Sequence, residues 1–407
     1  MKRGNYGSGS IEQRGPDRFR LTHYVGGKRH REWVNGTRSD ANRRLRELTA
    51  RADAGEHVPT SRTTLAAWVA EWLTLLARGE ASGMRRKGRV TPRTRERYQE
   101  LLASYVLPTL GTYPLQKLTP TQIDHVYIGL EQRLSSATVR HVHTALKACL
   151  ATAVRKGVLV NNPAGRADAP RKVDPEVGRA LSVEEVTRLL AGFTGTVYHP
   201  IVATAVMTGA RLSEILALPW SAVNFAANTI TISRAIERTR EFGTVIKEPK
   251  SWRGRRTISI DPTLTAILKA QHMQHLRLRA GVSEQTVVSL GAVRLPTEAL
   301  VFSATTARNG RFDFARIRNA RALTKEIRGR FRKLGFAGLR FHDLRVTHAT
   351  ALLDCGIPVH TVAQRLGNRP DVLLRAYAKH TSSVDERTNG VLATLAQSLG
   401  RKSAIAP

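Results

Sequence analysis

The chain has 407 residues, enough for two or three domains. It carries 65 lysines and arginines against 32 aspartates and glutamates, a formal net charge of +33. The charge is spread along the chain among 41% apolar residues, which argues against an isolated basic tail and favours a nucleic-acid partner. A ribosomal-type RNA binder is the simplest alternative on charge alone.

The cysteines and the apolar runs limit where the protein can act. Cys149 and Cys355 each lie in an apolar periodic run, so we expect two buried free thiols rather than a disulfide or a zinc site. The N-terminus lacks the apolar region of a signal peptide, and the longest apolar run, 201–207, is too short to span a bilayer. We therefore expect an intracellular, soluble protein with no membrane partner.

Residues 1–56 are predicted to form a small β-sheet with one helix. Alternating residues predict three short strands, separated by turn signals, at 10–14, 18–24 and 28–34. Ser39 is expected to cap a helix that runs to about residue 54. The basic residues of the sheet, our candidate DNA contacts, are Arg18, Arg20, Lys28, Arg29 and Arg31. Such a sheet can enter a DNA groove, or it can be a solvated surface packed on its own helix.

Residues 63–160 are predicted to form an all-α domain after a linker at 57–62. The first of four helices has one apolar face at helical spacing, made by Leu65, Trp68, Val69, Trp72 and Leu76. A Gly- and Arg-rich stretch, 78–90, is expected to be a flexible basic loop. The later helices have start signals at Thr91-Pro92, Thr119-Pro120 and Ser136, and the last of them is expected to stop at Gly157.

Residues 161–179 contain Asn-Asn-Pro, further prolines and several charges, and are predicted to be an interdomain linker. A capping box, Ser182-Val183-Glu184-Glu185, opens the last domain, 180–407. That domain is predicted to be mainly helical, with a small antiparallel β-sheet drawn from 229–233, 244–247 and 257–260. The fold class is therefore multidomain, with a small sheet and helix, an all-α domain, and a mainly α domain with a small sheet.

Four short segments of the last domain carry residues suited to phosphoryl transfer. They are Thr208-Gly209-Ala210-Arg211-Leu212-Ser213-Glu214, Pro249-Lys250-Ser251, His342-Asp343-Leu344-Arg345 and Arg375-Ala376-Tyr377. Arg211 and Arg345 can hold the non-bridging oxygens of a phosphodiester in bidentate contacts. Preorganised donors of this kind contribute roughly 2.7–4 kcal/mol each to transition-state stabilisation.

The remaining residues of the four segments suit proton transfer and nucleophilic attack. His342 lies on the same helix face as the following arginine and can hold or accept the proton of the attacking hydroxyl. Tyr377 is the candidate nucleophile. Lys250 is the candidate general acid for the 5′ oxygen, because a turn before a strand can deliver it there. Lys247, Arg253 or Arg255 could fill that role instead.

These segments, in residue type, order and spacing, resemble the tyrosine recombinase (phage-type integrase) family over roughly residues 63–395. The resemblance implies an arm-type DNA-binding domain at 1–56, a core-binding domain at 63–160 and a catalytic domain at 180–407. It implies a site-specific recombinase that cuts and rejoins DNA through a 3′-phosphotyrosyl ester, for a phage or mobile element. The ester conserves the bond energy, so no cofactor is expected.

The same resemblance implies partners and a location. Double-stranded DNA at core and arm sites is the expected substrate, held by a homotetramer on synapsed DNA. Accessory DNA-bending or excision-directing proteins are further expected partners. A bacterial cytoplasmic protein, associated with the nucleoid when bound, is the expected setting.

One position departs from the family pattern. Asn368 stands in Leu366-Gly367-Asn368, where the family has Leu-Gly-His or sometimes Trp, nine residues before Tyr377. An asparagine can donate a hydrogen bond to a phosphate oxygen but cannot carry charge, so a modest loss of transition-state stabilisation is expected. Glu214 is open to two interpretations: it orients an arginine, or it is a solvated helix charge.

The C-terminal segment and the class of protein each allow more than one interpretation. Apolar residues at helical spacing between 384 and 399 either pack on their own domain or dock on a neighbouring protomer, which the resemblance favours. A type IB topoisomerase shares this chemistry but acts alone. The non-enzymatic alternative is a DNA-binding regulator with an inactive site. The full set of Arg, Lys, His, Arg and Tyr argues against this alternative.

Overall fold

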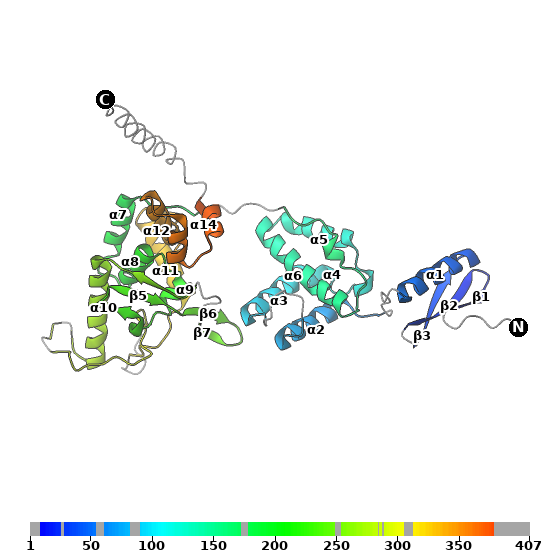
Figure 1. Ribbon diagram of the computed structural model, residues 1–407, viewed down its shortest axis with the longest axis horizontal. Coiled ribbons are helices and arrows are strands. Elements are labelled where there is room, and N and C mark those ends of the chain that lie inside the picture. The colour runs from blue at the N-terminus through cyan, green and yellow to red at the C-terminus, as the bar shows by residue number, and fades with distance from the viewer. Residues whose placement is uncertain are drawn as a thin grey trace, which may run out of the picture. The chain divides into compact units, whose positions relative to one another are not determined.

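The computed structural model describes most of the chain as two compact units, 1–174 and 175–407, which are treated separately below (Figure 1). The described residues are 9–25, 28–53, 61–81, 90–171, 178–248, 254–283, 285–286, 289–304 and 312–377. Within these ranges, no helix has both the length and the apolar character that a bilayer crossing requires.

The first unit begins with the predicted three-stranded antiparallel sheet and its helix. The elements are β1 (Ser10–Gly15), β2 (Arg18–Val25), β3 (Lys28–Asn35) and α1 (Arg38–Asp53), with β2 in the centre. Phe19 and Leu21 alternate onto one face of β2 and pack with Ala41 and Leu48 of α1. This part of the chain therefore has a small core of its own.

The start of α1 differs from the prediction, because Thr37 caps it rather than Ser39. The hydroxyl of Thr37 accepts a hydrogen bond from the backbone N–H of Asp40 at 3.2 Å, and the Asp40 carboxylate accepts one from the Thr37 N–H at 3.0 Å. This reciprocal pair satisfies two N–H groups at the helix start. Ser39 lies within the first turn, where its hydroxyl is not needed as a cap.

The same unit continues as a helical bundle over the range predicted. Its elements are α2 (Leu65–Arg78), α3 (Pro92–Tyr105), α4 (Leu107–Leu110), the 3-10 turn η1 (Leu115–Lys117), α5 (Pro120–Glu131), α6 (Ser136–Arg155) and the turn η2 (Pro163–Gly165). All five residues predicted for the apolar face of α2 are buried. Thr91 and Thr119 are N-caps as predicted, whereas α6 is capped by Ser135, one residue before the predicted Ser136.

The start of the expected linker, 161–171, is packed on this bundle rather than extended between units. Ala164 is fully buried in the bundle core. The Asn162 side chain donates to the carbonyl of Lys147 at 2.9 Å, and the Asp168 N–H donates to the Asp124 carboxylate at 2.8 Å. Residues 82–89 and 172–177 lie outside the described ranges.

In its described residues the second unit is mainly helical, as predicted. The segment 244–247 does not join the predicted sheet, so the described residues form two small antiparallel sheets. Its helices are α7 (Val183–Phe193), α8 (His199–Thr208), α9 (Leu212–Ile215), the turn η3 (Trp220–Ala222), α10 (Pro262–Ala280), α11 (Ala320–Lys333), α12 (Asp343–Asp354), α13 (Val359–Leu366) and α14 (Pro370–Tyr377). Its strands are β4 (Val223–Asn224), β5 (Thr229–Ile232), β6 (Ala235–Thr239), β7 (Gly243–Lys247) and β8 (Arg256–Ser259). The predicted capping box of Ser182 and Glu185 opens α7.

The two sheets and the helix α8 organise this unit. One sheet has the order β4-β5-β8. The strands β6 and β7 form a separate hairpin (Figure 1). The apolar run 201–207 forms α8, which is largely buried and contacts α7, α10 and α12. A helix this apolar belongs in a protein core, where it fixes the start of the segment that carries Arg211.

The two cysteines differ in environment. Both are free thiols, but Cys149 is buried in the bundle and Cys355 is exposed. The prediction of two buried thiols is therefore wrong for Cys355. This residue caps the C-terminal end of α12, where the helix has already left the core.

Candidate active site

The turn between α8 and α9 presents Arg211. Gly209 ends α8 in the left-handed conformation, with a φ of 63°, and Arg211 is the N-cap residue of α9. The carboxylate of Glu214 accepts hydrogen bonds from the backbone N–H and from Nη1 of Arg211, both at 2.9 Å. Glu214 is only 5% exposed, so it orients the arginine and is not a solvated helix charge.

Arg345 reaches the same place from the first turn of α12. Its side chain is buried, with 4% of the residue exposed. Nη1 donates to the carbonyl of Gly209 at 2.7 Å, and Nη2 donates to the carbonyl of Leu366 at 2.7 Å. These contacts fix the guanidinium between the ends of α8 and α13.

Asn368 joins the two arginines, which we call the arginine clamp. Its carboxamide oxygen accepts a hydrogen bond from Nη2 of Arg211 at 2.6 Å and another from Nη2 of Arg345 at 3.0 Å. The donors lie 157 and 23 residues away in sequence, yet they converge on one oxygen atom. In the structure Asn368 thus acts as an acceptor toward the clamp, whereas the sequence predicted a donor to phosphate.

His342 lies beside the clamp as the N-cap residue of α12. Burial lowers the pKa of His342 below its ordinary value, and the positive charge of Arg345 lowers it further, against a smaller opposing effect of Asp343. The imidazole is therefore neutral at pH 7 and has a ring nitrogen that can accept a proton.

Lys250 and the Tyr377 side chain lie outside the residues that the structure describes. Lys250 falls in the segment 249–253, between β7 and β8, and so does Arg253, which could replace it as general acid. The two remaining candidates for that role have partners of their own: Lys247 forms an ion pair with Glu237, and Arg255 pairs with Glu248 at 2.9 Å. Tyr377 is the last residue of α14, which follows directly from the Asn368 turn.

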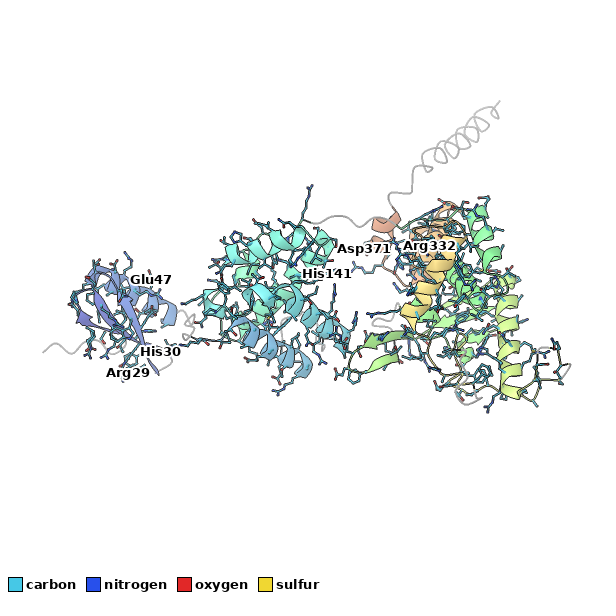
Figure 2. The ribbon with its side chains drawn as sticks, turned by 180° about the vertical axis from the view of Figure 1, so that it is seen from behind. Arg29, His30, Glu47, His141, Arg332 and Asp371 are labelled. Carbon is cyan, nitrogen blue, oxygen red and sulfur yellow. The ribbon has the colours of Figure 1, made fainter. Side chains whose placement is uncertain are left out.

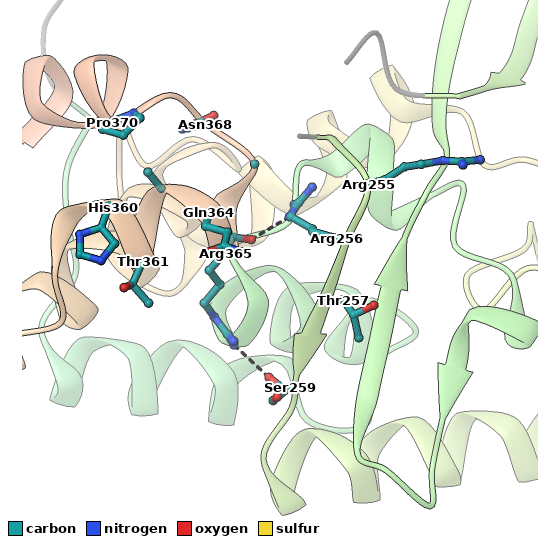
Figure 3. A pocket seen from close by; sticks show the side chains of 12 residues that line it. Arg255, Arg256, Thr257, Ser259, His360, Thr361, Gln364, Arg365, Asn368 and Pro370 are labelled. Atoms are coloured by element: carbon teal, nitrogen blue, oxygen red, sulfur yellow. Dashed lines mark hydrogen bonds between the residues drawn. The ribbon is translucent and has the colours of Figure 1, made fainter. Parts of the chain in front are cut away.

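Sequence reasoning missed Arg256, which is connected to the arginine clamp through Glu214. It donates from Nη2 to Glu214 at 2.8 Å. Its Nε donates to the carbonyl of Arg365 at 2.7 Å (Figure 3). A sequence signal was present: alternation along β8 puts Arg256 on the same buried face as Ile258. An arginine on a buried face requires an acceptor partner.

His348 and Arg365 make further polar contacts in the same part of the unit, and sequence reasoning missed these two residues as well. Nδ1 of His348 donates to the carbonyl of Val206 at 2.9 Å, so its Nε2 is the acceptor for Nε of Arg365 at 3.1 Å. Burial lowers the pKa of His348 to about 4. The neutral imidazole therefore links the end of α8 to α13.

A cavity of about 620 Å³ opens between β8 and α13 (Figure 3). Its lining includes Arg255, Arg256, His360, Arg365 and Asn368. These basic side chains give the cavity a positive electrostatic potential.

The N-terminal sheet places four of its five candidate basic residues on one face. In the register of β2 and β3, Arg20 pairs with Trp33, Thr22 with Arg31 and Tyr24 with Arg29, and cross-strand partners share a face. Arg18 shares this face by alternation, and its guanidinium lies 4.7 Å from the Trp33 ring centre.

Glu12 pairs with Arg20 on this sheet face, so that arginine is partly neutralised. The Lys28 side chain lies outside the described residues. In Figure 2, Arg29 marks the sheet and Glu47 marks α1. We call the sheet surface that carries Arg18, Arg20, Arg29 and Arg31 the arm face.

Comparison with known proteins identifies the class. The model of the phage integrase family matches residues 179–383, half of the chain, and that of the phage integrase N-terminal SAM-like domain matches 84–130. A tyrosine recombinase XerC-like protein of Caldanaerobacter subterraneus subsp. tengcongensis is 25% identical over 375 residues, 87% of this chain and 90% of that protein. The integrase of Mycobacterium phage FRAT1 is 24% identical over 296 residues, 72% of this chain and 80% of that protein.

Solved structures agree in fold. The Tn1549 transposon integrase in complex with transposon right end DNA gives a TM-score of 0.60 at 18% identity, covering 81% of this chain and 100% of that chain. A lambda integrase tetramer bound to a Holliday junction gives 0.52 at 14% identity, covering 90% and 97%. The chain belongs to the phage integrase family of tyrosine recombinases. It is an enzyme of site-specific DNA recombination, as the sequence motifs predicted.

Proposed function

We propose that this recombinase integrates and excises a phage or other mobile element by cutting and rejoining double-stranded DNA through a 3′-phosphotyrosyl intermediate. The observation that carries the proposal is the convergence of two guanidinium groups on one oxygen atom, that of Asn368. A non-bridging phosphate oxygen is an acceptor of the same kind and carries more negative charge. Two fixed positive groups around such an oxygen stabilise the charge that develops when phosphorus is attacked.

The proposed reaction assigns one role to each residue of the site. The hydroxyl of Tyr377 attacks phosphorus, a bond forms between the phenolic oxygen and phosphorus, and His342 takes the hydroxyl proton. The bond from phosphorus to the 5′ oxygen breaks, and Lys250 gives that oxygen a proton. Attack by a 5′ hydroxyl of another strand reverses these steps and releases the tyrosine.

The domains divide the binding of DNA in this proposal. The arm face of the N-terminal sheet contacts arm sites, and the helical bundle and the catalytic unit contact core sites. A homotetramer on synapsed DNA, helped by accessory DNA-bending or excision-directing proteins in a bacterial cytoplasm, completes the scheme. The complexes of the Tn1549 integrase with transposon right end DNA and of a lambda integrase tetramer with a Holliday junction support the DNA substrate and the tetramer in this scheme.

A nicked suicide duplex tests the proposal, because loss of the short fragment after cleavage traps the covalent intermediate. Wild-type protein is expected to form an SDS-resistant adduct, and the Tyr377→Phe variant, which keeps the aromatic ring, is expected to form none. Absence of an adduct with wild-type protein on its own attachment site would favour a DNA-binding regulator. Relaxation of supercoiled plasmid without any synapsis, and no recombinant product, would favour a topoisomerase.

A further inference from the structure

Arg256 is a buried cation in a strongly basic chain. Its side chain is 5% exposed and that of its partner Glu214 is 6% exposed. The guanidinium donates to both oxygens of Glu214, at 2.8 and 3.3 Å, and to the carbonyls of Gly254 at 3.3 Å and Arg365 at 2.7 Å. Because each of its nitrogens has an acceptor inside the protein, Arg256 is not placed to bind DNA.

These contacts connect three segments of the site. Arg256 begins β8, three residues after the end of the segment 249–253, which contains Lys250. Glu214 in turn holds the backbone and the guanidinium of Arg211. The third partner, the carbonyl of Arg365, directly precedes the Leu366 carbonyl that binds Arg345.

We propose that Arg256 is a positioning residue for DNA cleavage. It holds Glu214, and through it Arg211, in register with the α13 turn that carries Asn368. The inference rests on the cleavage reaction proposed above. A positioning role differs from a purely stabilising one, because the positioning role requires Glu214 to remain an ionised carboxylate that orients Arg211.

The electrostatics of Glu214 give the proposal a distinctive signature. Among the described residues, the charged groups that face this carboxylate are Arg256 from β8 and Arg211 from the start of α9. Burial alone raises the pKa of Glu214, but the hydrogen bonds and charge of Arg256, with a smaller contribution from Arg211, bring it below the ordinary value. Without Arg256, burial is opposed by Arg211 alone, so the pKa of Glu214 rises.

A raised pKa has a consequence for the reaction. A protonated Glu214 has lost an acceptor, so it can no longer hold both the backbone N–H and the guanidinium of Arg211. Cleavage by a variant without Arg256 should therefore depend on pH in a way that wild-type cleavage does not. A residue that only stabilises the fold would lower the amount of folded protein without adding this dependence.

The test compares Arg256→Met, Arg256→Lys and the double variant Arg256→Met/Glu214→Gln with wild type in the full chain. Single-turnover cleavage of the suicide duplex at saturating protein is measured from about pH 5.5 to 9, together with gel-shift affinity and melting temperature. The matched control is Arg234→Met, because Arg234 forms an exposed pair with Glu298 at 3.4 Å and makes none of the contacts described above. This control is expected to match wild type in every measurement.

For Arg256→Met we expect affinity within a few fold of wild type and cleavage slower by about 100-fold at pH 7, the order of effect seen when a transition-state donor is misplaced. The ratio of its rate to the wild-type rate should rise with pH. In the double variant this ratio should be independent of pH, because glutamine does not titrate. Arg256→Lys keeps the positive charge but cannot reach both Glu214 and the Arg365 carbonyl. Its cleavage rate should therefore lie between the rates of wild type and Arg256→Met.

Several outcomes would overturn the inference while leaving the proposed function intact. One is cleavage by Arg256→Met and Arg256→Lys within a few fold of wild type at every pH. Another is a loss of DNA binding equal to the loss of cleavage. If Arg256→Met does not fold, Arg256→Lys decides the question, and full activity in that variant excludes the two-partner geometry. Failure of the wild-type protein to form any adduct would instead refute the proposed function.

Discussion

Replacing Asn368 with aspartate should stabilise the protein and impair its chemistry. The two residues have the same shape, so the carboxylate can accept the hydrogen bonds of Arg211 and Arg345 at the distances now seen, 2.6 and 3.0 Å. Both hydrogen bonds already have a charged donor, and the aspartate adds a charged acceptor, which turns each into an ion pair and strengthens it. Without DNA, Asn368→Asp should therefore unfold at the same temperature as wild type or higher.

The effect on cleavage has the opposite sign. A carboxylate lowers the charge of the arginine clamp from two positive charges to one, and it repels the phosphate that must approach. At about 5 Å and an effective dielectric constant of about 20, one such charge pair is worth about 3 kcal/mol. Cleavage should therefore fall by about 100-fold or more. Because two arginines hold the pKa of an aspartate low, mild acid should not restore the rate.

The assay measures single-turnover cleavage, gel-shift affinity and thermal unfolding on the same preparations. Asn368→Ala is the matched control, because it removes the oxygen but leaves both positive charges, and it should lose only about 10-fold in rate. A gain in stability with a loss of rate cannot come from a damaged fold. Wild-type cleavage by Asn368→Asp would refute the reasoning, since it would mean that residue 368 and the phosphate do not compete for the same donors.

Three further predictions address the remaining parts of the site. Arg211→Ala and Arg345→Ala should each keep affinity within a few fold and lose roughly 100-fold or more in cleavage, and equal losses of both in a gel-shift and cleavage comparison would indicate a general binding role. Tyr377→Phe should bind DNA and assemble synapses without any covalent adduct, and peptide mapping of the wild-type adduct should find the nucleotide on Tyr377 and on no other residue. Arg29→Gln and Arg31→Gln should each weaken binding to an arm-site duplex and lower its salt slope by about 1, whereas footprints showing only core-sequence protection would contradict a separate arm site.

Much of the fold could be predicted because its signals are local. The alternation of the N-terminal strands, the apolar face of α2 and the Thr-Pro starts of α3 and α5 all depend on neighbouring residues. The errors at helix starts are small for the same reason. Ser135 offers the same capping chemistry as the predicted Ser136, and Thr37 the same as the predicted Ser39. Only the path of the backbone decides which hydroxyl caps the helix.

The contacts behind the site could not be predicted in this way. The motifs identified Arg211 and Arg345, but the partner of each depends on segments that meet only in the folded unit. Arg256 and Glu214 are 42 residues apart, and the residues around each of them do not indicate that the two side chains form a pair. Asn368 is the clearest case: the family pattern predicts a residue that faces phosphate, whereas its actual contacts are set by the end of α13 meeting the end of α8.

The contacts of the clamp also explain how it can be rigid without DNA and still open to a phosphate. Each arginine keeps permanent acceptors, Glu214 for Arg211 and the backbone carbonyls of Gly209 and Leu366 for Arg345. The neutral oxygen of Asn368 is shared between them. A phosphate that displaces it replaces two hydrogen bonds to a neutral acceptor with two to an anionic acceptor, and neither guanidinium has to leave its other partners. Since a charged acceptor at this position would remove that advantage, a neutral residue there is consistent with an active enzyme.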